Sequence, residues 1–266
     1  MQTVKLNDIG KEVLKLKELL QKQGAGIEVN ETFDAATKAA VIAYQKAHGI
    51  DADGIVGYRT WEALLLSGVS AGERLTYEDF ELVASLIDVE VAALKAVQEV
   101  ESGGKGGFFA PGKPAILFEG HIFWSQLKRR GINPENYCKG NEHILYPRWE
   151  KGHYKGGLAE YDRLEQARKI NYEAADASAH WGMFQIMGFN YAACGENSVA
   201  GLVNKMMQNE LGQLILIGRF IRQSTSLHIA LQNRDWAAFA KCYNGPRYAE
   251  DKYDVKLATA YKKHQQ

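Results

Sequence analysis

The segment Asp88-Val-Glu-Val-Ala-Ala-Leu-Lys-Ala-Val-Gln-Glu-Val-Glu101 has the pattern of one amphipathic helix, and Ser102-Gly103-Gly104 stops it. At about 100° per residue, Leu94, Val97 and Glu101 fall on one side of this helix. Lys95 and Glu99 fall on the opposite side at i,i+4 spacing, where we expect a solvated pair. Asp88 is placed to cap the N-terminus. The two glutamates therefore differ, because Glu101 belongs to the apolar face and Glu99 to the solvated one.

Glu101 projects from this apolar face in the last turn of the predicted helix. A carboxyl held against apolar side chains has its charged form disfavoured, so its pKa rises. A negative charge at a helix C-terminus acts in the same direction. A carboxylic acid that keeps its proton near neutral pH is what glycoside cleavage needs in its general acid. The alternative is a glutamate that turns outward into water at the helix end, and periodicity by itself leaves both open.

Helical patterns extend over most of the chain on either side of this segment. Thr76 and Asp79 can form a capping box at the start of the next helix upstream. Residues 102–115 and 131–157 are rich in Gly, Pro and Lys and are expected to be loops, with a short hairpin around 149–157. The helices are expected at residues 77–87, 89–101, 160–170, 198–224, 228–241 and 251–264.

The first 66 residues have a different residue pattern, which predicts three short helices. The first covers about 11–23, the second follows an Asp34 cap and runs to His48, and the third carries Trp61. A domain of this size has a thin core and usually binds rather than catalyses. The fold class is therefore mainly α, with a small three-helix domain (1–68), a linker (69–75) and a larger, mostly helical domain (76–266).

Charge balance and cysteine usage argue against several classes of protein. Lys plus Arg and Asp plus Glu both number 32, so the zero net charge argues against a nucleic-acid binder and against electrostatic attachment to membranes. The three cysteines lack CxxC spacing and the seven histidines form no HExxH motif, so we expect no metal and no cofactor. No apolar run suits a signal peptide or a membrane span, so we expect synthesis in a cytoplasm without stable membrane insertion.

Three short motifs carry a resemblance to a known superfamily. Glu101-Ser102-Gly103-Gly104 is similar to the Glu-Ser motif that ends the catalytic helix of goose-type lysozymes and soluble lytic transglycosylases. Gly182-Met-Phe-Gln-Ile186 resembles their Gly-x-x-Gln-Ile segment, and Tyr243-Asn-Gly-Pro246 their Tyr-Asn-x-Gly element. Together with Pro114-Ala-Ile-Leu-Phe-Glu-Gly-His121, these motifs resemble the N-acetylmuramidase domain of phage endolysins over about residues 76–264. His180 departs from the pattern, which has a small residue such as Ser before Trp-Gly.

The N-terminal region resembles a three-helix peptidoglycan-binding domain over about residues 8–66. The segments that carry this second resemblance are Phe33-Asp-Ala-Ala-Thr37, Ala43-Tyr-Gln-Lys-Ala-His-Gly49 and Asp53-Gly-Ile-Val-Gly-Tyr-Arg-Thr-Trp61. It implies that Asp53, Tyr58, Arg59 and Trp61 contribute to wall binding. The two resemblances were found separately and point to the same polymer.

The resemblance also implies roles for individual residues of the larger domain. Glu101 is expected to protonate the glycosidic oxygen, and Glu119 is a candidate second carboxylate, or else a structural partner of His121 or Arg129. The predicted substrate contacts, each with core packing or capping as its alternative, are Ser102, Trp181, Phe184, Gln185, Tyr243 and Asn244.

The function implied is that of an endolysin, which hydrolyses the β-1,4 bond between N-acetylmuramic acid and N-acetylglucosamine in bacterial peptidoglycan and lyses the host. One alternative is a lytic transglycosylase, in which the muramic C6 hydroxyl attacks and leaves a 1,6-anhydro sugar. Another is a non-catalytic wall-binding phage component. The resemblance further implies a monomer that accumulates in the host cytoplasm and needs a holin to reach the wall.

Overall fold

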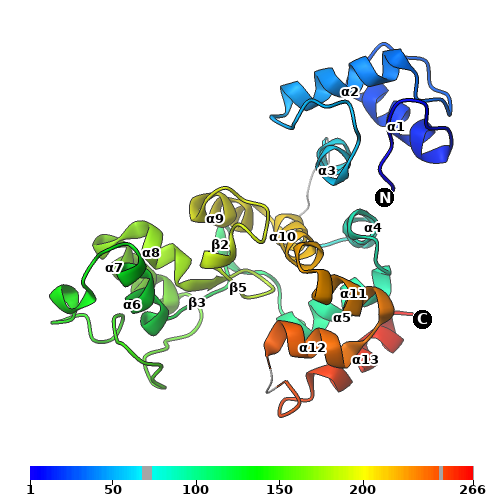
Figure 1. The fold of residues 1–266 in the computed structure, drawn as a ribbon. Coiled ribbons are helices and arrows are strands. Elements are labelled where there is room, and N and C mark those ends of the chain that lie inside the picture. The colour runs from blue at the N-terminus through cyan, green and yellow to red at the C-terminus, as the bar shows by residue number, and fades with distance from the viewer. Residues whose placement is uncertain (68–73, 246–247, 266) are drawn as a thin grey trace. The chain divides into compact units, whose positions relative to one another are not determined.

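The fold is that of a computed structural model, which describes residues 1–67, 74–245 and 248–265. The chain divides into two compact units, one with Met1–Ser70 and Ser85–Asp88, the other with Ala71–Ala84 and Val89–Gln266 (Figure 1). Most of the predicted linker, residues 69–73, lies outside the described residues. No helix within the described ranges is both long and apolar enough to cross a membrane. The chain is mainly helical, which confirms the predicted fold class.

The first unit contains three short helices, α1 (Lys11–Lys22), α2 (Ala35–Ala47) and α3 (Tyr58–Leu66). The Asp34 side chain caps α2 as predicted, because Oδ1 accepts from the Thr37 N–H at 2.7 Å. The hydrogen bonds from the Thr37 hydroxyl and N–H lower the pKa of Asp34 to about 2. Two isolated bridges, Val4–Val56 and Ile9–Thr32, join the segment before α1 to the segments between the helices. The fully buried core includes Val13, Leu16, Leu20, Phe33, Val41, Trp61 and Leu64.

Among the helices of the second unit around the segment 88–101, the one expected at 77–87 begins and ends at the predicted residues, and those expected at 89–101 and 251–264 do so to within two residues. The helices around this segment are α4 (Tyr77–Ile87), α5 (Val91–Ser102), α9 (Val199–Gln208), α10 (Glu210–Gln223), α11 (Thr225–Asn233), α12 (Trp236–Asn244) and α13 (Tyr253–His264). Thr76 and Asp79 exchange both bonds of the predicted capping box, at 2.8 and 3.2 Å. The predicted cap at Asp88 is wrong, because Asp88 adopts a left-handed conformation after α4 and Glu90 precedes α5.

Two helices predicted as continuous are each broken into two. Asn209 interrupts the stretch 198–224, because its side chain accepts from the Gly212 N–H at 2.7 Å and so starts α10. Arg234 interrupts the stretch 228–241 in a left-handed conformation between α11 and α12. In Figure 1, α10 lies between α9 and the group formed by α5, α11, α12 and α13, and most of its side chains are buried.

A small sheet and further helices complete the second unit. Strand β3 (Ile116–Phe118) pairs antiparallel with β4 (Ala179–Trp181), which pairs with β5 (Ile186–Met187), in the order β3-β4-β5. A separate hairpin joins β1 (Phe108–Ala110) and β2 (Lys113–Pro114). Around the sheet lie α6 (Gly120–Arg129), η1 (Pro134–Tyr137), α7 (Ala159–Ile170), α8 (Tyr172–Ala177) and η2 (Gly188–Asn190). The hairpin expected at 149–157 is wrong, because that segment has no strand.

Candidate active site

Glu101 lies in the last turn of α5 with its carboxyl buried. Gly103 follows the helix in a left-handed conformation (φ 58°), which suits a residue without a Cβ. Oε1 of Glu101 is shielded from solvent and has no hydrogen-bond partner among the described residues. Desolvation by burial raises the pKa of Glu101 from 4.5 to about 7, and the nearby Asn244 amide lowers it by less. The predicted rise in pKa is confirmed, and about half of the carboxyls keep their proton at neutral pH.

Glu99, two residues before Glu101, lies in the opposite environment on the solvated face of α5. Its carboxylate accepts from Lys263 Nζ at 2.9 Å and lies 2.8 Å from His264 Nε2. The predicted Lys95–Glu99 pair is wrong, because α13 packs along α5 and brings the Lys263 and His264 side chains to Glu99. The Lys95 ammonium instead lies over the rings of Tyr77 and Phe80.

Tyr243 and Asn244, the last two residues of α12, lie beside Glu101. The Tyr243 hydroxyl donates to the Phe184 carbonyl oxygen at 3.2 Å. Desolvation and the Glu101 charge raise the pKa of Tyr243 well above its usual value, so the phenol stays neutral. Nδ2 of Asn244 is buried and unpartnered among the described residues, close to Glu101 but outside hydrogen-bond geometry. The predicted motif Tyr243–Pro246 is described only up to Gly245.

The predicted Gly-x-x-Gln-Ile segment forms the turn between β4 and β5. Gly182 has φ 70°, and a Cβ there would lie 2.8 Å from the Gln213 side chain, so the position requires glycine. Gln213 of α10 accepts from the Met183 N–H at 2.7 Å. Gln185 ends the turn with φ 49°, a conformation that costs a residue other than glycine about 1–2 kcal/mol. Its side-chain amide donates to the Gly182 carbonyl at 2.8 Å, so Gln185 stabilises its own turn.

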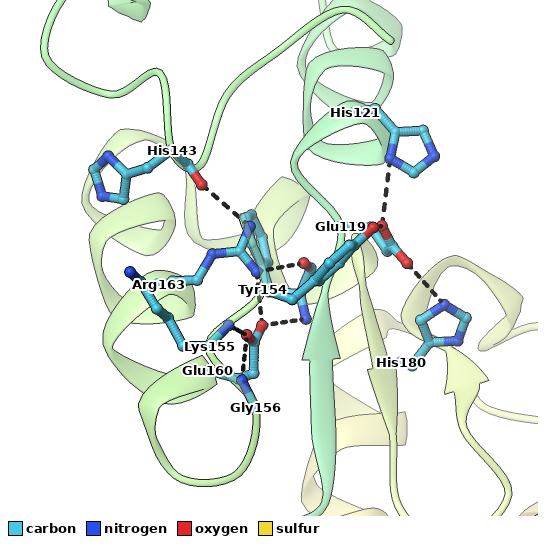
Figure 2. A network of polar contacts seen from close by, with 10 residues as sticks. Glu119, His121, His143, Tyr154, Lys155, Gly156, Glu160, Arg163 and His180 are labelled. Carbon is cyan, nitrogen blue, oxygen red and sulfur yellow. Dashed lines mark hydrogen bonds and ion pairs between the residues drawn. The ribbon is translucent and has the colours of Figure 1, made fainter. Parts of the chain in front are cut away.

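Glu119 lies directly after β3 at the centre of a polar cluster (Figure 2). The Tyr154 hydroxyl donates to its Oε2 at 2.7 Å, His121 Nδ1 lies 3.3 Å from the same oxygen, and His180 Nε2 lies 3.5 Å from Oε1. Burial alone would raise the pKa of Glu119. The hydrogen bonds of His180 and Tyr154 and the charges of His180 and His121 outweigh it and hold this pKa below its usual value. Arg129, the alternative partner predicted for Glu119, makes no contact with it in this cluster.

A fully buried ion pair, Glu160 with Arg163, lies next to this cluster (Figure 2). Glu160 of α7 accepts from Arg163 Nη1 at 2.7 Å and from the Phe118 N–H at 3.1 Å. The guanidinium also donates to the Phe118 carbonyl at 2.9 Å and to the His143 carbonyl at 3.1 Å. The pair therefore fixes the end of β3, from which Glu119 projects. Sequence analysis missed this pair, since i,i+3 charges on a helix usually form a solvated pair.

Three of the side chains predicted to contact the sugar are instead buried in the core or hydrogen-bonded to neighbouring protein atoms. Trp181 is fully buried and donates to the Asp176 carbonyl at 2.9 Å. Phe184 is 1% exposed, so neither ring offers a face to a sugar, and we interpret both as core. The Ser102 hydroxyl accepts from the Gly104 N–H at 3.1 Å and from the Gln98 amide at 3.2 Å, which stabilises the end of α5.

Open hollows near the end of α5 were not predicted. One of about 200 Å³ is lined by residues that include Gln98, Gly104 and Met183. A second, of about 570 Å³, lies beside the β1–β2 hairpin, with Phe108 and Phe109 in its lining. The two hollows share Arg74, Gly106 and Glu210. The Phe109 ring is 39% exposed, so an aromatic face is available here.

The residues predicted for wall binding in the first unit are of two kinds. Trp61 is 1% exposed and donates to the Gln2 carbonyl at 2.9 Å, so it belongs to the core. Asp53 accepts from the Ile55 N–H at 2.8 Å and from the Gln45 amide at 3.2 Å, which shapes its loop. Tyr58 is half-buried, with its hydroxyl 3.4 Å from Glu62, and Arg59 is exposed. Arg59 and the outer part of Tyr58 remain accessible to a ligand.

Comparison with known proteins identifies both parts of the chain. Residues 90–265 match the family described as N-acetylmuramidase, and residues 9–64 match the putative peptidoglycan binding domain. The chain belongs to the N-acetylmuramidase family. The crystal structure of an endolysin from the Burkholderia phage AP3 is 38% identical, covers 99% of this chain and 99% of that one, and has a TM-score of 0.67. No curated protein matches.

These matches confirm the resemblance to a modular endolysin with a wall-binding domain ahead of a muramidase domain. The muramidase is a glycoside hydrolase, and its substrate is peptidoglycan. Within residues 1–67, 74–245 and 248–265, no group of three or more His, Cys, Asp or Glu side chains is arranged to hold a metal ion.

Proposed function

We propose that Glu101 of this muramidase is the general acid that protonates the oxygen between N-acetylmuramic acid and N-acetylglucosamine. The observation that carries the proposal is the Glu101 carboxyl, whose Oε1 is buried without a hydrogen-bond partner among the described residues and whose pKa is raised to about 7. Proton donation to the leaving oxygen lowers the barrier to breaking the β-1,4 bond. Tyr243 and Asn244, which border the carboxyl, position it and the sugar.

Water completes the cut in this proposal. Glu119, predicted as a second catalytic carboxylate, is left out of the reacting groups, because Tyr154, His121 and His180 occupy its two oxygens. Those contacts stabilise the anion and make it a weak base. Either another bound group then activates the water, or the acetamido oxygen of the substrate attacks C1 as the protonated leaving group departs and water afterwards breaks that new C1–O bond. Gln185 contributes to the site indirectly, because it stabilises the turn between β4 and β5.

Wall attachment and release are further parts of the proposal. Residues 1–68 act as a peptidoglycan anchor for the catalytic residues 76–266, with Arg59 and Tyr58 as contacts. Tethering raises the concentration of the catalytic domain at the wall. The protein acts as a monomer and lyses the host after synthesis in its cytoplasm, once a holin opens a route to the wall, as the similarity to a phage endolysin suggests.

Mass spectrometry of digested peptidoglycan tests the reaction. We expect muropeptides with reducing ends from the wild-type protein and no release by Glu101→Gln, which keeps the shape of the side chain without the proton. Products dominated by 1,6-anhydro sugars would instead establish a lytic transglycosylase. Release by Glu101→Gln at the wild-type rate would remove Glu101 from the mechanism, and no release by either protein would leave only wall binding.

A further inference from the structure

His180 on β4 lies between two hydrogen-bond acceptors. Its Nδ1 is 2.8 Å from the carbonyl oxygen of Gln185, and its Nε2 is 3.5 Å from Glu119 Oε1 (Figure 2 shows the second contact). The Gln185 carbonyl can only accept, so Nδ1 donates to it, while Nε2 faces the Glu119 carboxylate. The imidazole therefore ties the end of β3 to the last residue of the β4–β5 turn.

The Glu119 end of this tie is fixed independently of His180. The Tyr154 hydroxyl and His121 hold Oε2, the other oxygen of the carboxylate, and the Glu119 side chain is buried. The buried Glu160–Arg163 pair holds the preceding residue, Phe118, through both its N–H and its carbonyl. Glu119 is thus a rigid anchor.

The other end of the tie is a strained peptide unit. Gln185 has a positive φ, and such a conformation persists only where its surroundings hold it. Its carbonyl is the atom that His180 contacts, and the carbonyl before it, that of Phe184, accepts the Tyr243 hydroxyl at 3.2 Å. The two carbonyls belong to the peptide groups on either side of the Gln185 Cα, so a change in the strained φ of Gln185 alters the orientation of one relative to the other. Tyr243 in turn lies close enough to Glu101 for the Glu101 charge to raise its pKa.

We propose that His180, anchored by Glu119, is a positioning residue for the catalytic acid, acting through the Gly182–Gln185 turn and Tyr243. The inference rests on the proposed role of Glu101. Without the tie, the turn relaxes, Tyr243 loses its acceptor, and water reaches the Glu101 carboxyl. The groups that face this carboxyl are Tyr243 and Asn244 from α12 and Tyr253 from α13, and those that face His180 are Glu119 and the Gln185 carbonyl.

Three variants of the full-length protein separate the two contacts of His180. His180→Asn keeps a donor at about the reach of Nδ1, toward Gln185. His180→Gln keeps a donor at about the reach of Nε2, toward Glu119, and His180→Ala keeps neither. His143→Ala is the matched control, since His143 is a histidine of the same region whose ring contacts only Gln166 among the partners described. The kcat, the KM and their pH dependence are measured on soluble glycan chains, with thermal unfolding to verify folding.

We expect kcat to fall about tenfold to hundredfold in His180→Ala and His180→Gln, with KM nearly unchanged, because the acid is misplaced but the sugar still binds. The alkaline limb of the kcat profile, near pH 7 in the wild type because Glu101 has a pKa of about 7, should move to lower pH as water reaches the carboxyl. His180→Asn, which keeps the donor to the Gln185 carbonyl but not the Glu119 anchor, should restore kcat and the limb in part, and His143→Ala should match the wild type.

Two results would overturn the positioning role. One is wild-type kcat and limb in both His180→Ala and His180→Gln. The other is a loss of kcat with an unmoved limb that His180→Asn shares equally, which is what a purely structural role gives. The Glu101→Gln variant separates this failure from failure of the proposed function. If Glu101→Gln is inactive while the His180 variants behave as the wild type, only the positioning role is lost, and if Glu101→Gln is active, the proposed function fails as well.

Discussion

Substitution of Glu101 by Gln should abolish activity and at the same time stabilise the fold at neutral and alkaline pH. Burial raises the pKa of this carboxyl from 4.5 to about 7. Between these two values the folded protein holds a proton that the unfolded chain has released, so the stability of the wild type falls as the pH rises through this window. The neutral amide of Gln has no such dependence. The difference in unfolding free energy between variant and wild type should therefore grow from pH 4.5 to pH 7 and then level off.

The size of the effect follows from the shift in pKa. A displacement from 4.5 to about 7, at 1.36 kcal/mol per pKa unit, corresponds to about 3 kcal/mol at the alkaline plateau. For a domain of this size that amounts to about 6–12 °C in unfolding temperature. Thermal unfolding of both proteins at pH 4, 5, 6, 7 and 8 measures it. Glu99→Gln is the matched control, since a carboxylate paired with Lys263 and His264 has a lowered pKa and should show no such gain.

A stability difference that stays flat across this pH range would refute the reasoning, because it would mean that Glu101 has the same pKa in the folded and unfolded protein and is ionised at neutral pH. Such a carboxylate has no proton to donate, so the same result would remove the basis for its assignment as the acid. A full loss of activity in Glu101→Gln with the expected pH-dependent gain in stability would show that the site sacrifices stability to keep its acid protonated.

Three further predictions concern the frame around the site and the anchor. Arg163→Met should destabilise the catalytic unit by about 3–5 kcal/mol in denaturant unfolding, because Glu160 would be left as a buried charge, while Arg130→Met, whose partner Glu173 is exposed, should cost at most about 1 kcal/mol. Gly182→Ala should lower stability by more than about 2 kcal/mol, since its Cβ meets Gln213 and Met206, and Gly140→Ala, with the same backbone sign but open space, should cost only about 1 kcal/mol; equal losses would contradict the packing argument. Deletion of residues 1–68 should leave a folded enzyme that hydrolyses soluble glycan as before but is pulled down less by purified peptidoglycan, and unchanged pull-down would count against the anchor.

Local chemistry determined which features of the fold could be predicted from sequence. The caps at Asp34 and Thr76 and the glycines after Glu101 act over three or four residues, so the helix ends near them were predicted closely. Strands β3 to β5 were missed, because they span only two or three residues each and β3 pairs with a partner more than 60 residues away. The single helix expected at 198–224 was wrong for the opposite reason, since its hydrophobic periodicity continues across the Asn209 cap.

The candidate site shows the same division between local and distant effects. Periodicity separated Glu101 from Glu99 correctly, because the buried face of α5 is a property of the helix itself. It paired Glu99 with the wrong lysine, because the true partners come from α13, at the far end of the chain. His180 was noted only as a departure from the family pattern. Its contacts with Glu119 and Gln185 become visible only once the sheet brings these residues together.

Glu101 and Glu119, the two carboxyls considered for catalysis, differ in pKa because their surroundings differ. Glu101 lies among neutral side chains, with no donor placed on Oε1 in the described residues, and its pKa rises. Glu119 is buried too, but a phenol and two imidazoles surround it, and its pKa falls. Burial therefore does not decide the outcome; the donors do. Near neutral pH only Glu101 has a proton to give, and Glu119 has a permanent charge with which to hold His180. Glu119, which has no proton to donate, is therefore suited to keep Glu101 in position through His180.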